Sequence, residues 1–263
     1  MKLFQEKYGP WALVTGASSG LGEEFARQLA PKGINLVLIA RRLERLDRLA
    51  SQLRETYHIE TRTVQADLAA DDFMPVIKNV SENLEIGLLI NNAGFGLTGE
   101  FLENSLQREM ELLYVNCRAP LMLAHEFGRQ MIARRKGGII FVSSMSAFFA
   151  APYWLGYSSS KAYNLFNGLA LWGELRKYNV DVQALCPGST KTEFGSVTGV
   201  RSRFGSMPPG PVIEESLRKL GKKPMVVTGF QNRMRRMGLH FVPRAITTLI
   251  AGRILRSLRV KTE

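Results

Sequence analysis

The fold is decided by the stretch Trp11-Ala12-Leu13-Val14-Thr15-Gly16-Ala17-Ser18-Ser19-Gly20-Leu21-Gly22. Its first five residues form a short apolar run, and a helical pattern follows the last glycine through Phe25 and Leu29. Glycines between a first strand and a first helix let the backbone approach a pyrophosphate, which the helix N-terminus attracts. The spacing Gly16-x-x-x-Gly20-x-Gly22 differs from the form G-x-G-x-x-G. The alternative is a tight turn that binds nothing, and the strand and helix around the glycines argue against it.

Strands and helices alternate along the rest of the chain. Residues 35–39 contain the uninterrupted apolar run Leu-Val-Leu-Ile, as expected for a strand buried on both faces of a parallel sheet. Alternation with helices of ten or more residues indicates βαβ units and right-handed crossovers. We therefore predict an α/β fold, a Rossmann-like doubly wound parallel sheet of about seven strands with helices on both faces, as a single domain over 1–263. Further strands are predicted at about 60–66, 87–91, 138–142, 180–185 and 225–228, and helices at about 72–84, 105–135 with a break near Pro120, 153–178, 212–220 and 244–259.

The net charge of +12 is concentrated in the C-terminal quarter. Residues 201–263 hold 14 Lys or Arg against 3 Asp or Glu, a balance of +11, whereas the first 200 residues hold 21 against 20, a balance of +1. Regional asymmetry of this kind suggests an anionic partner. No nucleic-acid-binding module is recognised, so we predict no nucleic acid partner.

The last predicted helix is both apolar and basic. Ile246, Leu249, Ile250 and Leu258 lie near one side, and Arg244, Arg253, Arg256 and Arg259 are interspersed. Such a helix either covers the sheet while its arginines face water, which we favour, or contacts an anionic membrane or carrier.

Cysteine and histidine usage indicates neither a disulfide framework nor a metal site. Cys117 and Cys186 are far apart and lie in apolar contexts, which fits a reducing compartment. His58, His125 and His240 lack metal-ligand spacing. No signal-peptide pattern begins the chain, and no uncharged run reaches the roughly 18 residues of a spanning helix. We therefore predict a cytoplasmic protein without a metal.

The end of the second predicted strand reads Ala40-Arg41-Arg42, with no Asp or Glu before Glu44. In dinucleotide-binding folds a carboxylate near this place binds the ribose 2′-OH, whereas an arginine accommodates a 2′-phosphate. Guanidinium groups match phosphate geometry. These residues therefore predict a preference for NADP. The alternative is two solvated arginines at the start of a helix.

Tyr157 and Lys161 are four residues apart, so on a helix they share a face. An unperturbed tyrosine, with a pKa of ~10, is ionised only about one part in a thousand at pH 7. A nearby ammonium and a cationic nicotinamide favour the phenolate, so we expect the pKa of Tyr157 to fall toward the working pH. An exposed helical pair is the alternative.

Together these segments resemble the motif set of the classical short-chain dehydrogenase/reductase family. Over roughly residues 8–194 the motifs occur in the family's order, and Ser144 precedes Tyr157 by the family's thirteen residues, which favours Ser144 over Ser143. The motifs are Thr15–Gly22, Asn91–Gly94, Asn116, Ser144, Tyr157 with Lys161, and Pro187-Gly188 with Thr192.

The resemblance implies a role for each residue. Tyr157 would protonate the carbonyl oxygen as hydride arrives, and Ser144 would hydrogen-bond that oxygen. Lys161 would also hold the nicotinamide ribose, and Asn116 would place a water in the proton relay. Taken singly, Ser144 also fits the end of a strand, and Asn116 fits a cap at a helix break. The implied cofactor-binding set is Gly16, Ser18, Ser19, Gly20, Leu21, Gly22, Arg41, Arg42, Asp67, Leu68, Asn92, Ala93, Gly94, Tyr157, Lys161, Pro187, Gly188, Thr190 and Thr192.

The predicted function is an NADP-dependent oxidoreductase that interconverts a ketone or aldehyde with an alcohol, on a small or lipophilic substrate such as a 3-oxoacyl group. A Gly- and Pro-rich stretch at 195–211, within a substrate loop of about 195–222, is expected to lie over the site as a mobile loop, ahead of a basic segment 223–263. Phe148, Phe149, Tyr153 and Trp154 form an apolar wall or ordinary packing. The alternative function is a non-catalytic NADP(H)-binding or peripheral membrane protein. The family's usual assembly through two long central helices implies a homodimer or homotetramer.

Overall fold

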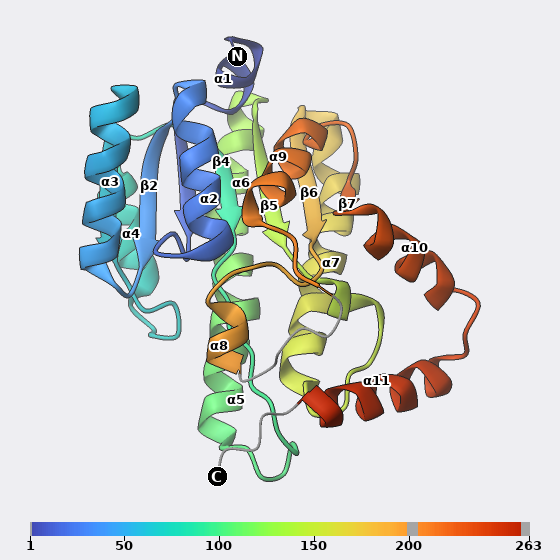
Figure 1. Cartoon of the computed structure of the whole chain (residues 1–263). Helices are drawn as coiled ribbons and strands as arrows, with labels where there is room; N and C mark the ends of the chain where they lie inside the picture. Colours follow the sequence, from blue (N-terminus) through green and yellow to red (C-terminus); the bar gives the residue numbers. More distant parts are fainter. Residues whose placement is uncertain (1, 199–204, 259–263) are drawn as a thin grey trace.

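Seven parallel strands form one sheet in the computed structural model, which describes residues 2–198 and 205–258 (Figure 1). The strand order is β3-β2-β1-β4-β5-β6-β7, and each neighbouring pair is parallel. This confirms the predicted doubly wound sheet. The strands are β1 Trp11–Thr15, β2 Asn35–Ala40, β3 Thr61–Gln65, β4 Ile86–Asn91, β5 Gly137–Val142, β6 Val180–Cys186 and β7 Met225–Val227.

Helices cover both faces of the sheet. Side chains of α2, α3 and α9 form the core on one face, and those of α4, α6 and the end of α7 form it on the other. The helices are α1 Lys2–Tyr8, α2 Gly20–Leu29, α3 Leu43–Tyr57, α4 Phe73–Ser81, α5 Leu106–Leu113, α6 Ala119–Arg134, α7 Leu155–Leu175, α8 Phe194–Thr198, α9 Pro209–Lys219, α10 Phe230–Leu239 and α11 Arg244–Leu258, with single turns η1 Ala30–Lys32, η2 Tyr114–Arg118, η3 Met145–Phe148 and η4 Arg176–Tyr178.

The sequence pattern explains the core. β4 is buried along its whole length, as its continuous apolar run predicts. Phe25 and Leu29, four residues apart on α2, are both fully buried because they share the face that packs on the sheet. Gly33 ends the short turn η1 that follows α2, with φ of 73°.

The two predicted helices meet near Pro120, as expected. The irregularity lies before the proline, in the π-helical turn η2 that joins α5 to α6. Pro120 is the second residue of α6, where a missing N–H costs little, and the wider turn accommodates it. Its carbonyl accepts a hydrogen bond of 3.2 Å from Nδ2 of Asn91.

Two helices lie where none was predicted near the C-terminal end. α8 begins at Phe194 and extends into the stretch read as a loop at 195–211, of which residues 199–204 are outside the described ones. α10 occupies a segment for which we expected no element, and Figure 1 shows it with α11 extending outward from the sheet. The short N-terminal helix α1 was not predicted either.

The strand order reverses between β1 and β4. Their carboxyl ends lie next to each other, and in open α/β sheets this switch point is where ligands bind. The glycine-rich turn follows β1 and the Asn91–Gly94 segment follows β4, so the fold brings two predicted motifs to one place.

Candidate active site

The glycine turn has a conformation that side chains would obstruct. Gly16 and Gly20 have φ of 66° and 60°, the left-handed region that favours glycine. A Cβ at Gly22 would lie 2.3 Å from the carbonyl oxygen of Gly16. The turn therefore holds its backbone close to the start of α2, with the exposed approach and helix N-terminus that a dinucleotide pyrophosphate requires.

Thr15 joins the two motifs at the switch point. Its hydroxyl accepts the backbone N–H groups of Asn92 and Ala93, each at 3.0 Å, and donates to the carbonyl of Ile90 at 3.2 Å. The amide of Asn92 donates back to the carbonyl of Thr15 at 2.8 Å. This network fixes the end of β4 against the end of β1.

Ser144, Tyr157 and Lys161 meet at the end of β5. Ser144 opens the turn η3, where its hydroxyl accepts the N–H of Ser146 at 3.1 Å. Tyr157 and Lys161 lie on α7 and are both buried, so they are not the exposed pair of the alternative interpretation. Nζ of Lys161 donates to the carbonyl of Val142 at 2.9 Å and lies 5.6 Å from the centre of the Tyr157 ring.

Gly94 brings the second motif against this group. A Cβ on it would lie 3.2 Å from Nζ of Lys161 and 3.0 Å from Oδ1 of Asn116. The backbone after β4 therefore passes directly beside the buried ammonium, and a larger residue there would displace either side chain.

The pKa values of the pair are shifted by burial. Burial raises the pKa of Tyr157 to about 12, although hydrogen bonding with Ser144 lowers it in part. Burial lowers the pKa of Lys161 to about 8. In the protein alone the pKa of Tyr157 is therefore raised, because loss of solvent outweighs the hydrogen bond with Ser144, and the lowering by a cationic nicotinamide stays a prediction. At pH 7 Tyr157 is a protonated acid beside a largely protonated lysine.

Aromatic rings account for the burial of Tyr157. Ring centres of Trp154 and Phe194 lie 5.0 Å and 5.1 Å from that of Tyr157. Phe194 begins α8, and the far end of α8 is held by a hydrogen bond of 2.8 Å from the Thr98 hydroxyl to the carbonyl of Thr198. α8 thus covers the tyrosine.

Of the four aromatic residues proposed as a wall, only Trp154 has a described ring contact with Tyr157. Phe148 instead packs under Arg236, whose guanidinium lies 5.3 Å from the ring centre. Sequence reasoning missed Phe194. Its signal was its place directly after Thr192-Glu193, one residue before the stretch 195–211 expected to cover the site.

Asn116 is fully buried in the π-helical turn η2. Its amide accepts the N–H of Phe95 at 3.1 Å and donates to the carbonyl of Phe95 at 2.9 Å and to the hydroxyl of Ser160 at 3.0 Å. Its backbone carbonyl accepts from Asn164 at 2.8 Å. The side chain therefore joins η2, α7 and the segment after β4, which positions the other groups.

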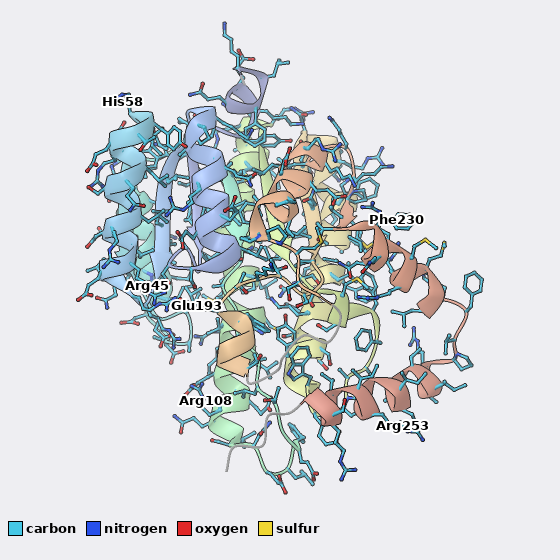
Figure 2. The ribbon with its side chains drawn as sticks, in the orientation of Figure 1. Arg45, His58, Arg108, Glu193, Phe230 and Arg253 are labelled. Carbon is cyan, nitrogen blue, oxygen red and sulfur yellow. The ribbon has the colours of Figure 1, made fainter. Side chains whose placement is uncertain are left out.

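Arg42 lies over the glycine turn. Its guanidinium donates to the hydroxyls of Ser18 at 3.2 Å and Ser19 at 2.9 Å. It also forms an ion pair of 2.9 Å with Glu193, which pairs with Arg45 at 2.6 Å. Figure 2 shows Glu193 and Arg45 side by side. These two arginines hold the pKa of Glu193 below its ordinary value. Arg42 is therefore not merely a solvated charge.

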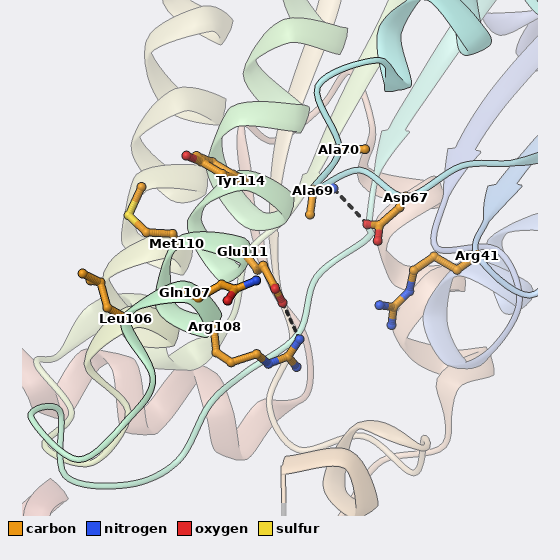
Figure 3. A pocket seen from close by; sticks show the side chains of 10 residues that line it. All are labelled: Arg41, Asp67, Ala69, Ala70, Leu106, Gln107, Arg108, Met110, Glu111 and Tyr114. Atoms are coloured by element: carbon orange, nitrogen blue, oxygen red, sulfur yellow. Dashed lines mark hydrogen bonds and ion pairs between the residues drawn. The ribbon is translucent and has the colours of Figure 1, made fainter.

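A pocket of about 800 Å³ lies between the ends of β2 and β3 and helix α5 (Figure 3). Arg41 and Asp67, both in the predicted cofactor set, line one side of it, and Arg108 and Glu111 line the other. Asp67 accepts the N–H of Ala69 at 3.0 Å. Leu68, also predicted, is buried beneath this segment.

The residues after β6 complete the same edge of the sheet. A Cβ at Gly20 would lie 3.1 Å from the side chain of Thr192, so Thr192 covers the glycine turn. Thr190 donates to the carbonyl of Gly188 at 3.1 Å, and the carbonyl of Pro187 accepts the N–H of Met145 next to Ser144. The structure thus gathers the predicted cofactor and catalytic residues around one switch point.

Fold and site together define a dinucleotide-dependent oxidoreductase. The sequence profile of the short chain dehydrogenase family matches residues 10–199. The chain belongs to this family, which confirms the resemblance found in the sequence and its assignment as an oxidoreductase.

Individual relatives agree. A 7beta-hydroxysteroid dehydrogenase of Mediterraneibacter gnavus is 30% identical over 235 residues, which cover 87% of this chain and 89% of that protein. A very-long-chain 3-oxoacyl-CoA reductase of Phaeosphaeria nodorum is 34% identical over 221 residues, 81% of this chain and 64% of the other. The structure of a short-chain dehydrogenase from Sphingobium yanoikuyae in complex with NADPH has a TM-score of 0.79 and 30% identity, and covers 90% of this chain and 97% of its own.

Two negative observations apply to the described residues alone. None of their helices is long and apolar enough to cross a membrane. No group of three or more His, Cys, Asp or Glu side chains among them is arranged to hold a metal ion.

Proposed function

We propose that the protein is an NADP-dependent carbonyl reductase or alcohol dehydrogenase acting on bulky, lipophilic ketones and secondary alcohols. The observation that carries the proposal is Tyr157, which is protonated, buried and placed beside Lys161 and Ser144 under apolar rings. A non-catalytic binding protein would not require these three polar groups together at a nucleotide-binding edge.

The chemistry follows from these positions. A bound nicotinamide supplies or accepts the hydride at the substrate carbon. Tyr157 donates its proton to the carbonyl oxygen in reduction, and Ser144 hydrogen-bonds that oxygen. The Lys161 ammonium stabilises the phenolate left on Tyr157, and Asn116 fixes the segments that hold all three. Substrate contact falls to α8 and the stretch toward α9, within the single domain.

The preference for NADP rests on the arginines. Arg42 holds its guanidinium over Ser18 and Ser19 of the turn, and Arg41 lines the neighbouring pocket. No carboxylate occupies the strand end before Glu44. The relative solved with NADPH supports the same assignment. A lower KM for NADH than for NADPH would contradict it.

Substrate class is inferred from surroundings and relatives. Trp154 and Phe194 make the neighbourhood of Tyr157 apolar, which suits a lipophilic ring system or acyl chain. Two relatives are a hydroxysteroid dehydrogenase and a 3-oxoacyl-CoA reductase. We place steroid-type ketones first and 3-oxoacyl thioesters second.

We also propose a cytoplasmic homodimer or homotetramer. Cys117 and Cys186 are free thiols, as a reducing compartment favours. Apolar side chains are exposed on the central helices, which gives a second copy a surface to cover. They are Leu106, Met110 and Leu113 on α5, Leu121 and Met122 on α6, and Phe166 on α7.

An NADPH-oxidation screen over steroid ketones, 3-oxoacyl thioesters and aldehydes tests the function. Turnover is expected with a bulky ketone and is expected to vanish in Tyr157→Phe, which removes only the phenolic hydroxyl. NADPH binding, followed by protein fluorescence, should persist in that variant. Unimpaired turnover by Tyr157→Phe would refute the assigned acid.

A further inference from the structure

We propose that α10 and α11 form a docking surface for an anionic lipid bilayer. The surface, called the α10–α11 surface below, consists of exposed apolar side chains on both helices and the arginines between them. The apolar members are Phe230, Met234, Met237, Phe241, Ile246, Leu249 and Ile250.

Helix α10 presents its apolar side to solvent. Its apolar residues Phe230, Met234 and Met237 recur at spacings of four and three, which places them on one face, and Phe230 and the Phe241 that follows the helix are 70% and 82% exposed. The opposite side turns inward and is polar. There Asn232 is buried and donates to the carbonyl of Thr228 at 2.8 Å, and Arg236 lies over Phe148. This is the reverse of a helix that packs its apolar face on a core.

Helix α11 follows α10 in the chain and exposes further apolar side chains. Ala251 and Leu255 are its buried side chains, and a Cβ at Gly252 would lie 3.1 Å from Pro152, so this side packs on the protein. Ile246, Leu249 and Ile250 remain exposed, with Leu249 at 67%. The sequence-based preference for a packed helix with only its arginines in water is therefore wrong for these three residues. The side chain of Leu258 and the whole of Arg259 are outside the described residues.

Charge identifies the partner. Residues 230–258 contain six arginines and no Asp or Glu. Figure 2 shows Phe230 and Arg253 at the outer side of the two helices. Two copies of so basic a surface would repel each other, whereas anionic headgroups attract it, by about fivefold in binding for each basic residue at the surface. Apolar side chains flanked by arginines match helices that lie in the plane of a bilayer interface.

The two helices that carry the surface pack, through their other side, beside the catalytic residues. Arg236 of α10 stacks on Phe148 in the turn that Ser144 opens, and Gly252 of α11 packs on Pro152, which precedes α7. Docking would therefore bring the site next to the phase in which a lipophilic substrate dissolves. This last step rests on the proposed function, whereas docking itself does not.

Sedimentation of the full chain with vesicles tests the docking. Phosphatidylcholine vesicles with and without phosphatidylserine are compared at low and high salt. We expect binding to the anionic vesicles that salt weakens. The variant Phe230→Ser/Phe241→Ser should bind the vesicles at least about tenfold more weakly, because it lacks two rings that docking would bury in the bilayer. Leu3→Ser is the matched apolar control, since Leu3 is also 82% exposed and lies on α1.

A charge series separates the electrostatic part. Arg244→Gln/Arg256→Gln should weaken binding to the anionic vesicles, whereas Arg48→Gln/Arg129→Gln, the same charge change elsewhere, should not. Retained NADPH binding shows that each variant is folded. Failure of the natural chain to bind anionic vesicles, or equal binding by all variants, would overturn the proposal. Self-association without lipid that Phe230→Ser/Phe241→Ser abolishes would overturn it in favour of a second copy. No readout depends on turnover, so failure of the proposed function leaves the test intact.

Discussion

Oε2 of Glu193 lies 2.9 Å from Nη1 of Arg42, which connects the segment after β6 with the end of β2. The same carboxylate reaches Arg45, so it neutralises both guanidinium groups at the place assigned to the 2′-phosphate. A 2′-phosphate would compete with Glu193 for the same partners. Because Glu193 directly precedes Phe194, the cofactor end and the cover over Tyr157 are adjacent in the chain.

Replacing Glu193 with Gln should tighten NADPH binding and leave NADH binding unchanged. The change removes the competing carboxylate, and an exposed ion pair contributes about 0.2–1 kcal/mol, so the gain should not exceed about fivefold. Fluorescence titration with both cofactors measures it. Glu82→Gln makes the same charge change at an exposed position elsewhere and should have no effect on the ratio. Weaker NADPH binding by the Glu193 variant would mean that Glu193 assists the cofactor.

Arg42→Ala should weaken NADPH binding about tenfold or more with little change for NADH. A hydrogen bond to a charged group contributes about 1.5–3 kcal/mol, and here two hydroxyls of the turn also lose their donor. Arg41→Ala is the neighbouring comparison, and the larger loss of the NADPH preference identifies the arginine that holds the phosphate. Equal losses for NADPH and NADH in Arg42→Ala would remove this residue from the 2′-phosphate site.

The sequence predicted the parts of the molecule that depend on local patterns. Continuous apolar runs predicted the strands, and the positive φ values of Gly16 and Gly20 explain why glycines stand there. The i, i+4 spacing correctly predicted that Tyr157 and Lys161 share a helix. These features follow from chain geometry over a few residues.

What escaped prediction depends on contacts between distant segments. Two contacts join residues far apart in the sequence, so no local periodicity predicts them. They are the Glu193–Arg42 ion pair and the Phe194–Tyr157 ring contact. The pKa of Tyr157 is raised, because packing against Phe194 helps to remove solvent from its side chain. α10 was not predicted, although Phe230, Met234 and Met237 recur at helical spacing, and these residues face outward.

Phe194→Ala should lower the pKa of Tyr157 from about 12 toward its ordinary value, because burial is the main cause of the rise and Phe194 supplies part of it. Phenolate absorbance is measured against pH in Phe194→Ala and in Phe194→Ala/Tyr157→Phe. The difference between the two curves gives the titration of Tyr157 alone. Phe101→Ala, which removes an exposed ring elsewhere, is the control. An unchanged midpoint would show that α8 does not shield the tyrosine.

Lys161→Met should change how the free energy of unfolding depends on pH, because burial lowers the pKa of Lys161 from 10.5 to about 8 in the natural protein. Between these values the unfolded chain binds a proton that the folded chain does not, so the natural protein gains stability as pH rises and loses it as pH falls through about 8. The variant lacks this contribution. At pH 7 its unfolding free energy should therefore exceed that of the natural protein by up to about 3 kcal/mol. The loss of the hydrogen bond from Lys161 to Val142 reduces this difference. The difference should become smaller as the pH approaches 10.

Urea unfolding at a series of pH values from 7 to about 9.5 measures this gap, and Tyr157→Phe is the matched control at the same site. The raised pKa of Tyr157 gives stability that is fully present below its unfolded value of 10.0 and is lost only as pH rises through about 12. Between pH 7 and 9.5 the unfolding free energy of Tyr157→Phe should consequently change with pH as that of the natural protein does. Over the same range the value for Lys161→Met should approach that of the natural protein. Parallel curves for Lys161→Met as well would contradict the lowered pKa of Lys161, and the lysine would then stay fully protonated beside Tyr157 over this whole range.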